Sequence, residues 1–205
     1  LRTVVLSLAV ISGVDDALQQ IYGGRGPTLD FLKATGSNAI AIHRSRTVED
    51  ETFLAINSHQ PLEGPVAWYE AHLCSDEGWN ILGGLFPGGA TVFHGVNEHL
   101  AWAHTVNYQD KLDTYQLQTD PARPNQYFFD GKWLFLEEKT VKLRVKGLPV
   151  AVKRKAYWSR YGPTVVTGRG TFAIRTGAFM DFRGMEQWYR MNKARSFHEF
   201  YEVLK

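Results

Sequence analysis

Ser37 is the residue of this sequence best placed to act as a nucleophile, because it follows Gly36 in the stretch Thr35-Gly36-Ser37-Asn38. A serine hydroxyl attacks poorly until a base removes its proton, and a free α-amine with a pKa of ~8 is such a base. Cleavage of the Gly36–Ser37 bond would give Ser37 both groups. The glycine has no Cβ and tolerates the strained backbone that attack on its own carbonyl requires. Gly-Ser pairs also occur in ordinary turns, so the pair alone does not decide between the two interpretations.

Three histidines, His94, His99 and His104, recur at a five-residue interval and raise the alternative of a metal-dependent hydrolase. Zinc sites use such side chains. On β-strands, however, this interval alternates between the two faces of a sheet, so the three rings would not converge without a bulge. The glycine pairs at 83–84 and 88–89 likewise lack the spacing of a phosphate-binding loop. The sequence therefore favours the serine over a zinc or phosphate site.

Residues 57–90 are rich in glycine, proline and aromatic residues and show little periodicity, which is typical of a functional loop. Apolar side chains in this loop would form the walls of a substrate pocket. The candidate pocket residues are Pro61, Leu62, Trp68 and Phe86. In one alternative the aromatic side chains only fill the core. In another, the protein is a non-catalytic β-rich module whose loop binds an apolar ligand, and Ser37 is a turn residue.

The composition indicates one globular domain or a large part of one. The 205 residues are 44% hydrophobic, which is enough for a sizeable core. Lys+Arg 23 against Asp+Glu 21 gives a net charge of +2, and no basic cluster has the density of a nucleic-acid surface. We therefore expect no nucleic-acid partner. The single cysteine, Cys74, excludes an internal disulfide and is expected to be a small buried residue.

The apolar segment at residues 1–14 resembles the hydrophobic part of a signal peptide. Arg2 is its only positive charge, however, and no small-residue cleavage site follows cleanly. The segment is also too short to span a bilayer. We expect it to be interior sequence, and we expect no membrane partner.

Two short strands are expected to position Ser37. Residues 38–42 and 52–56 predict a hairpin closed by the charged turn at 47–51. Ser37 would then lie at the mouth of a strand, against a rigid sheet.

The rest of the chain predicts further strands and then helices. Residues 91–175 alternate short strands with turns, which is typical of antiparallel sheet. Ser196 followed by Glu199 is a capping box that predicts a helix over 197–205, and another helix is expected at 185–192. The predicted fold class is therefore α+β with predominantly antiparallel sheets.

Several short motifs keep a recognisable order and spacing along this chain. They occupy residues 36–42, 45–47, 54–62, 68–73, 86–88, 95–105 and 110–113. Together they resemble the start of the β-chain in the penicillin acylase family of N-terminal-nucleophile (Ntn) hydrolases. The resemblance covers about residues 36 to 205, whereas the first 35 residues match far less well.

This resemblance implies part of an αββα sandwich and a boundary at the nucleophile. Residues 1–36 would be spacer or the end of an upstream α-chain segment, and residues 37–205 the N-terminal, incomplete part of the β-chain domain. It implies an exported precursor, periplasmic or secreted, that cleaves itself at Gly36-Ser37 and keeps its α-chain as a partner. The substrate would be a small acyl amide, such as a penicillin or an acyl-homoserine lactone, hydrolysed through an acyl-enzyme.

The resemblance also implies the groups that assist Ser37. One oxyanion donor would be the backbone N–H of Val106. The residue flanking the nucleophile is best matched by Gln60, with His59 one position out of register. The second oxyanion donor, an asparagine side chain, would lie beyond residue 205. On this interpretation the 205 residues alone should be inactive.

Asp110, Leu112 and Asp113 resemble the family's calcium site, which has two carboxylates with a backbone carbonyl between them. Oxygen ligands of this kind suit Ca²⁺. The remaining ligands would come from distant segments, so Ca²⁺ is expected in the full-length protein. Without the resemblance, the same residues would be a solvated loop.

Overall fold

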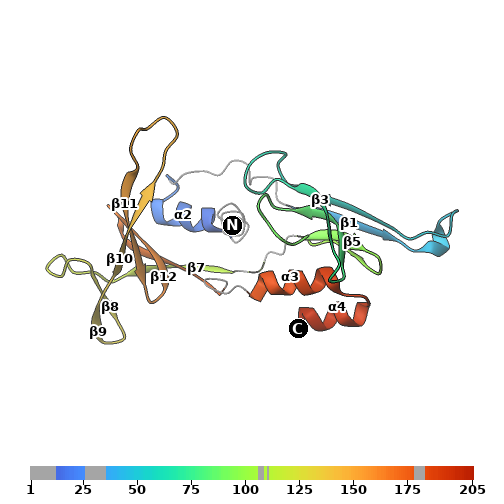
Figure 1. The fold of residues 1–205 in the computed structure, drawn as a ribbon. Helices are drawn as coiled ribbons and strands as arrows, with labels where there is room; N and C mark the ends of the chain where they lie inside the picture. Colours follow the sequence, from blue (N-terminus) through green and yellow to red (C-terminus); the bar gives the residue numbers. More distant parts are fainter. Residues whose placement is uncertain (1–12, 26–35, 106–108, 110, 178–182) are drawn as a thin grey trace. The chain divides into compact units, whose positions relative to one another are not determined.

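The computed structural model of the protein describes residues 13–25, 36–105, 109, 111–177 and 183–205 (Figure 1). They fall into two compact units. Unit 1 contains residues 36–105, 109 and 183–205, and unit 2 contains residues 13–25 and 111–177. All strand pairs within these residues are antiparallel, which confirms the predicted α+β class with mainly antiparallel sheets. The division at residue 37 concerns covalent cleavage and stays a prediction.

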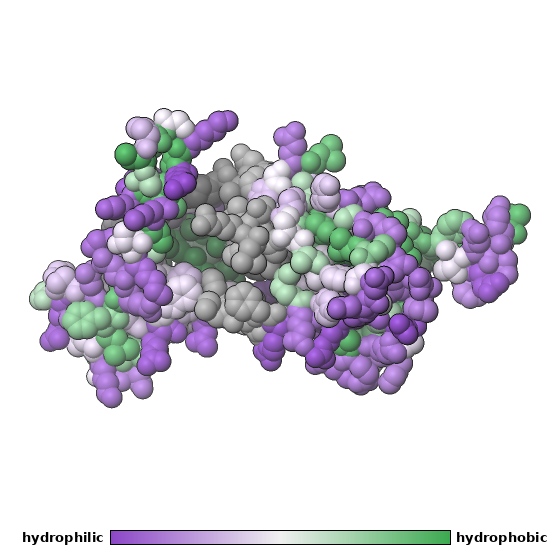
Figure 2. Space-filling model, in the orientation of Figure 1, coloured by the Kyte–Doolittle hydropathy of each residue, from purple (hydrophilic) through white to green (hydrophobic). Residues whose placement is uncertain are grey.

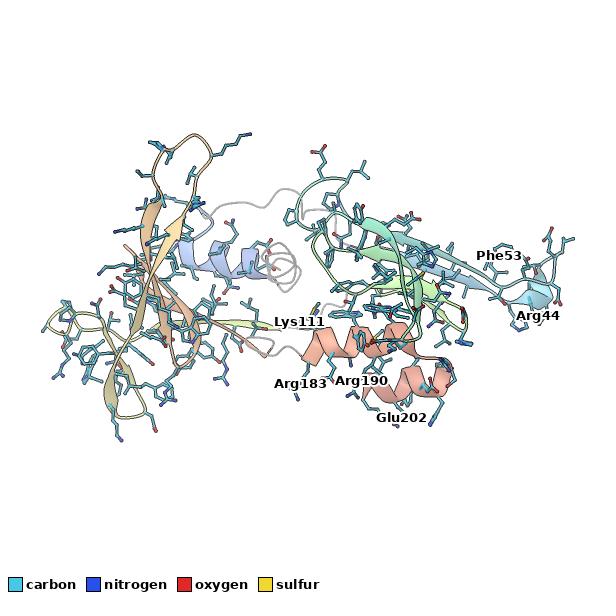
Figure 3. All side chains as sticks on the ribbon, viewed as in Figure 1. Arg44, Phe53, Lys111, Arg183, Arg190 and Glu202 are labelled. Atoms are coloured by element: carbon cyan, nitrogen blue, oxygen red, sulfur yellow. The ribbon has the colours of Figure 1, made fainter. Side chains whose placement is uncertain are left out.

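Unit 1 begins with the hairpin of β1 (Ser37–Ile42) and β2 (Phe53–Ser58), in which Ser37 lies opposite Ser58. The two strands contain no charged residue. Charges gather in the connecting turn, which contains the short 3-10 helix η2 (Arg44–Arg46) and an ion pair between Arg44 and Asp50. Figure 3 shows the side chain of Arg44 at this distal end. The predicted hairpin is confirmed.

A four-stranded sheet forms the middle of unit 1. Its order is β3 (Tyr69–Ser75), β4 (Trp79–Leu85), β5 (His94–Asn97) and β6 (Ala101–Trp102). Helices α3 (Arg183–Lys193) and α4 (Phe197–Leu204) cover one face, where Met191 and Phe200 join a core with Ile81. Strand β2 lies over the other face. Unit 1 thus stacks a helical layer, a sheet and a hairpin.

Side-chain hydrogen bonds fix the helices of unit 1. Asn192, with only 1% of its surface exposed, accepts from the N–H of Val92 at 2.9 Å and donates to its carbonyl at 2.8 Å. At the start of α4, Ser196 Oγ accepts from the N–H of Glu199 at 3.2 Å, so the predicted cap is confirmed. The helix expected at 185–192 is confirmed within α3. These contacts tie α3 to the chain that leads into β5.

Unit 2 is a twisted sheet with a helix and a separate small hairpin. The sheet order is β10 (Glu137–Leu143), β11 (Val152–Ser159), β12 (Gly162–Thr167), β13 (Gly170–Thr176) and β7 (Leu112–Leu117). The hairpin pairs β8 (Gln126–Phe129) with β9 (Lys132–Phe135). Helix α2 (Val14–Tyr22) buries Ala17 and Ile21 against Ile174 of the sheet. Tyr127 packs in a second cluster, and its hydroxyl accepts from the N–H of Arg160 at 2.8 Å.

Cys74 is exposed, so the expectation of a buried cysteine is wrong. Strand β3 alternates its side chains between two faces, and Cys74 shares the face opposite the helices with His72. Its Sγ lies 3.1 Å from Nε2 of that histidine. Cys74 is therefore exposed because of its position in the strand, despite its small side chain.

The helices among the described residues are all too short to cross a membrane. Hydrophobic and hydrophilic residues are interspersed over the visible surface of each unit (Figure 2).

Candidate active site

Ser37 is the first residue of β1 and is half-buried. Its hydroxyl donates to the carbonyl oxygen of Gly36 at 2.5 Å. The hydroxyl therefore lies beside the peptide group that it would have to attack.

The Gly36 carbonyl oxygen accepts a second hydrogen bond, from the backbone N–H of His59 at 3.2 Å. Two donors on one carbonyl oxygen polarise the group and favour negative charge on the oxygen. Strand register explains the contact, because Ser37 lies opposite Ser58 and the residues next to that pair are Gly36 and His59. The hairpin thus brings His59 to the Gly36–Ser37 bond, while the role of Gln60 beside the nucleophile stays a prediction.

The His59 ring is oriented by a contact with β1. Its Nε2 lies 3.0 Å from Oδ1 of Asn38, and in the neutral tautomer that donates through this contact Nδ1 keeps a lone pair. A Cβ placed on Gly36 would lie 3.1 Å from Nδ1. The basic nitrogen therefore faces Gly36. Crowding by this ring, and not a left-handed backbone, is what favours glycine at position 36.

Gln60 occupies the turn that follows β2. It is half-buried, and its backbone N–H donates to the Ser58 carbonyl at 2.7 Å. Extended outward, the predicted hairpin (38–42 with 52–56) would place Ser58 beside Gly36, one residue short of His59.

A groove of about 480 Å³ lies between β2 and the sheet of unit 1. Apolar side chains form its walls, and Ser58, the partner of Ser37 across the hairpin, also lines it. Among the described residues that line the groove, Glu70 carries the charge. The apolar residues of its walls are Leu54, Ile56, Trp68, Leu82, Val96 and Ala101.

The floor of the groove is main chain, since Gly83, Gly84 and Gly95 all line it. Gly83 lies opposite Gly95 in the β4–β5 ladder. A Cβ on Gly83 would collide with the carbonyl oxygen of His94, and one on Gly95 with the carbonyl oxygen of Leu82. The close approach of two backbones thus requires glycine at both positions.

The predicted pocket residues differ in where they lie. Trp68 lines the groove. Phe86 is 2% exposed and stacks on the Trp68 ring at a centroid distance of 4.4 Å, so it belongs to the core and supports the wall from behind. Pro61 is half-buried, and Leu62 is 98% exposed. Neither Pro61 nor Leu62 lines this groove.

His94 and His104 meet within unit 1, although the sequence pattern alone did not predict this. The backbone N–H of His104 donates to Nδ1 of the His94 ring at 2.8 Å. The indole N–H of Trp188 donates to Nε2 of the His104 ring at 3.0 Å. Burial lowers the pKa of His94 to about 4, with a smaller contribution from His104, and burial also lowers the pKa of His104. His99 is exposed beside Glu98.

Both imidazoles are therefore neutral near pH 7, and one nitrogen of each is already engaged as an acceptor. Within the part of the chain that the structure describes, no three metal-ligating side chains come together. The pair joins β5, the segment after β6 and α3, and we assign it a structural role.

The predicted oxyanion donor and the predicted calcium site fall at least partly outside the described residues. The structure does not describe Val106 or Asp110. Leu112 begins β7 and packs near α2, while Asp113 is exposed on β7 opposite Arg175. The Asp113 carboxylate is thus accessible to a cation, and the calcium site stays a prediction.

Comparisons with known proteins extend over most of the chain. Residues 5–205 match the family model described as penicillin amidase. The acyl-homoserine lactone acylase PvdQ of Pseudomonas putida is 32% identical over 90% of this chain and 27% of the relative. Aculeacin-A acylase of Actinoplanes utahensis is 27% identical over 82% of this chain and 22% of the relative. The chain thus spans about a quarter of the curated relatives that it matches.

Among solved structures, a thermostable penicillin G acylase from Alcaligenes faecalis superposes with a TM-score of 0.57 at 24% identity. The match covers 66% of this chain and 25% of that one. It confirms the expected fold, which this chain shares with part of that penicillin G acylase.

Proposed function

Because this chain belongs to the penicillin amidase family, we propose that it carries the nucleophile of an amide hydrolase, Ser37, released when the precursor cleaves its own Gly36–Ser37 bond. The observation that supports this most directly is the contact of the Ser37 hydroxyl and the His59 N–H with the same Gly36 carbonyl oxygen.

Self-cleavage starts with attack of Ser37 Oγ on the Gly36 carbonyl carbon. The hydroxyl proton moves to a base, for which Nδ1 of His59 is the candidate, and the His59 N–H stabilises the negative oxygen. The C–N bond then breaks, and the protonated base returns the proton to the departing nitrogen. This leaves an ester between Gly36 and the Ser37 side chain, which water hydrolyses. The products are a Gly36 carboxylate and a Ser37 with a free α-amine.

In the mature enzyme the α-amine of Ser37 takes the proton from its own hydroxyl as that hydroxyl attacks the substrate amide. The amine product leaves, and water hydrolyses the acyl-enzyme to release the acid. The backbone N–H of Val106 and an asparagine beyond residue 205 stabilise the oxyanion, and each such donor typically lowers the barrier by roughly 3–4 kcal/mol.

The substrate is an acyl amide whose apolar acyl group enters the groove beside β2. Its walls of Leu54, Ile56, Leu82 and Val96 suit a hydrocarbon chain. Acyl-homoserine lactones fit this description, and so do penicillins. The whole protein is exported, keeps its α-chain after cleavage, and binds Ca²⁺ through Asp110, Leu112 and Asp113.

Intact-mass measurement of the whole protein tests the maturation step. We expect the wild type to yield two chains with a new terminus at Ser37, and Ser37→Ala to remain one chain. Ser58→Ala is the matched control, because it removes the hydroxyl directly opposite in the same hairpin, and it should still be cleaved. If the wild type and Ser37→Ala both remained single chains, self-cleavage would be refuted.

Two other functions can be separated from this one by simple assays. The apolar groove is also compatible with a non-catalytic module that binds a ligand, which would bind acyl amides without turning them over. A metal-dependent hydrolase would lose its activity when a chelator removes the catalytic metal. The engaged nitrogens of His94 and His104 argue against the latter.

A further inference from the structure

The hairpin of β10 and β11 in unit 2 extends beyond the rest of its sheet (Figure 1). Strand β11 pairs with β12 only through residues 157–159, whereas it pairs with β10 through residues 152–158. Residues 139–155 therefore form a two-stranded ribbon that lacks a third strand. This ribbon is solvent-exposed along most of its length.

The ribbon is strongly basic. Its 17 residues contain no acidic residue, and the basic ones are Lys139, Lys142, Arg144, Lys146, Lys153, Arg154 and Lys155. The overall charge of +2 hides this concentration, because acidic residues are abundant elsewhere in the sequence.

Strand register sorts these charges. Lys142 lies directly opposite Lys153, and Thr140 opposite Lys155, so three lysines share one face. Like charges directly opposite each other destabilise a hairpin. An isolated ribbon therefore gains nothing from the Lys142–Lys153 pair, whereas an anionic surface would relieve the repulsion.

Most of the charges have no counter-ion within the described residues. Lys139 pairs with Glu137, and Lys155 pairs with Glu138, both at the base of the ribbon. Among the ion pairs of the described chain, none involves Lys142, Arg144, Lys146 or Lys153.

The opposite face carries apolar side chains between Lys139 and Arg154, and the tip is apolar and exposed. Val141 lies opposite Arg154, and Leu143 opposite Val152, on the second face. Leu143 is 49% exposed, and at the tip Leu148 and Val150 are 52% and 72% exposed. In Figure 2 hydrophobic and hydrophilic residues lie next to each other over this hairpin. Basic and apolar groups together are the features that bind a bilayer interface.

Nucleic acid fits the ribbon less well. Residues 139–155 contain no aromatic side chain on which a base could stack. A duplex would also leave the apolar tip in contact with water or phosphates. A second alternative is that the charges only prevent the edge strand β10 from pairing with other chains. This alternative does not explain why the tip is apolar and exposed.

We propose that the β10–β11 ribbon docks the protein on an anionic lipid surface, with its lysines and arginines on the headgroups and Leu148 and Val150 inserted at the tip. This goes beyond amide hydrolysis and is independent of Ser37. It also differs from the expectation of no membrane partner, which followed from composition and not from strand register.

Vesicle sedimentation with the whole protein tests the proposal. Wild type should bind vesicles that contain phosphatidylglycerol, and should bind phosphatidylcholine vesicles weakly. The combined variant Lys142→Gln, Arg144→Gln and Lys153→Gln should lower partitioning onto the anionic vesicles roughly a hundredfold, because each charge near such a surface contributes. The matched control neutralises exposed charges elsewhere in unit 2, Lys132→Gln, Arg160→Gln and Arg175→Gln, and should retain most of the binding.

A second variant separates lipid from other polyanions. Leu148→Ser with Val150→Ser should weaken binding to the anionic vesicles about tenfold while leaving all charges in place. Both ribbon variants should still hydrolyse soluble substrate, which shows that they are folded.

Several outcomes would overturn the proposal. They are the absence of wild-type binding to anionic vesicles, an equal loss in the ribbon and control variants, and serine substitutions at the tip without effect. Tighter binding of the ribbon to duplex DNA than to vesicles would identify nucleic acid instead. Exchange protection, in the whole protein without vesicles, of the β10 and β11 amides that do not bond across the hairpin would show that other parts of the protein cover the ribbon.

Discussion

The hairpins β1–β2 and β10–β11 are both long antiparallel pairs, but the strands of the first are uncharged and those of the second are rich in basic residues. In β1–β2 the strands are uncharged, and the charged residues gather in the turn around Arg44 and Asp50. In β10–β11 lysines and arginines run along both strands. The first hairpin lies against a sheet across an apolar groove, whereas the second extends past its sheet. The comparison shows that register decides which residues become neighbours. Both hairpins are largely exposed, so the distribution of charge decides which kind of surface each one presents.

The largest effect is expected from His59, because this residue tests whether register gives β1–β2 its chemistry. We expect His59→Ala to slow cleavage of the Gly36–Ser37 bond roughly a hundredfold to a thousandfold, since it removes the basic nitrogen that faces Gly36. Gln60→Ala, one residue further, should be cleaved at the wild-type rate. The uncleaved fraction, followed over time on denaturing gels, measures both. Equal slowing by the two substitutions would contradict the role of register.

The next effect compares how the two units are fixed internally. Asn192→Ala leaves both backbone groups of Val92 buried without their partner, and should lower the free energy of unfolding by about 2–3 kcal/mol. Tyr127→Phe in unit 2 removes one acceptor from the partly buried N–H of Arg160 and should cost about 1 kcal/mol. Urea unfolding of the whole protein gives both values. A larger loss for Tyr127→Phe would reverse the ranking.

A smaller effect should depend on pH and belong to unit 1. The folded-state pKa of His94, about 4, lies below its ordinary value of 6.5, so the unfolded chain binds the proton more readily. Stability contributed by neutral His94 is therefore complete above pH 6.5 and falls as the pH drops towards 4. Between pH 7 and pH 5 we expect a loss of about 1–2 kcal/mol.

His94→Asn sharpens this test, because its amide oxygen can still accept from His104 but does not titrate. The difference in unfolding free energy between pH 7 and pH 5 should shrink in this variant and persist in His99→Gln, whose ring is exposed. An unchanged pH dependence in His94→Asn would show that another group is responsible.

Sequence patterns predicted the elements of this fold well, because they depend on local periodicity. The alternation in residues 38–42 and 52–56 predicted the β1–β2 hairpin, and the Ser196–Glu199 cap predicted α4. The family resemblance was confirmed by the comparisons.

Contacts that depend on pairing between strands were not predicted. The contact of the His59 N–H with the Gly36 carbonyl follows from the register of β1 and β2, which the motifs did not give, while the role of Gln60 stays a prediction. His94 and His104 meet because β5 turns back through β6, which no residue interval reveals. The exposure of Cys74 likewise depends on which face of β3 the helices cover. Strand register and the order of the layers are properties of the folded sheet, so they cannot be predicted from short sequence motifs.

The glycine floor of the groove has a consequence for altering selectivity. A side chain at Gly83 or Gly95 would push β4 and β5 apart before it narrowed the cavity, so neither position offers a gradual adjustment. Changes in the length or breadth of the ligand accepted must come from the walls, at residues such as Leu54, Leu82 and Val96. A library designed to retune this groove should therefore vary its sides and keep its base constant.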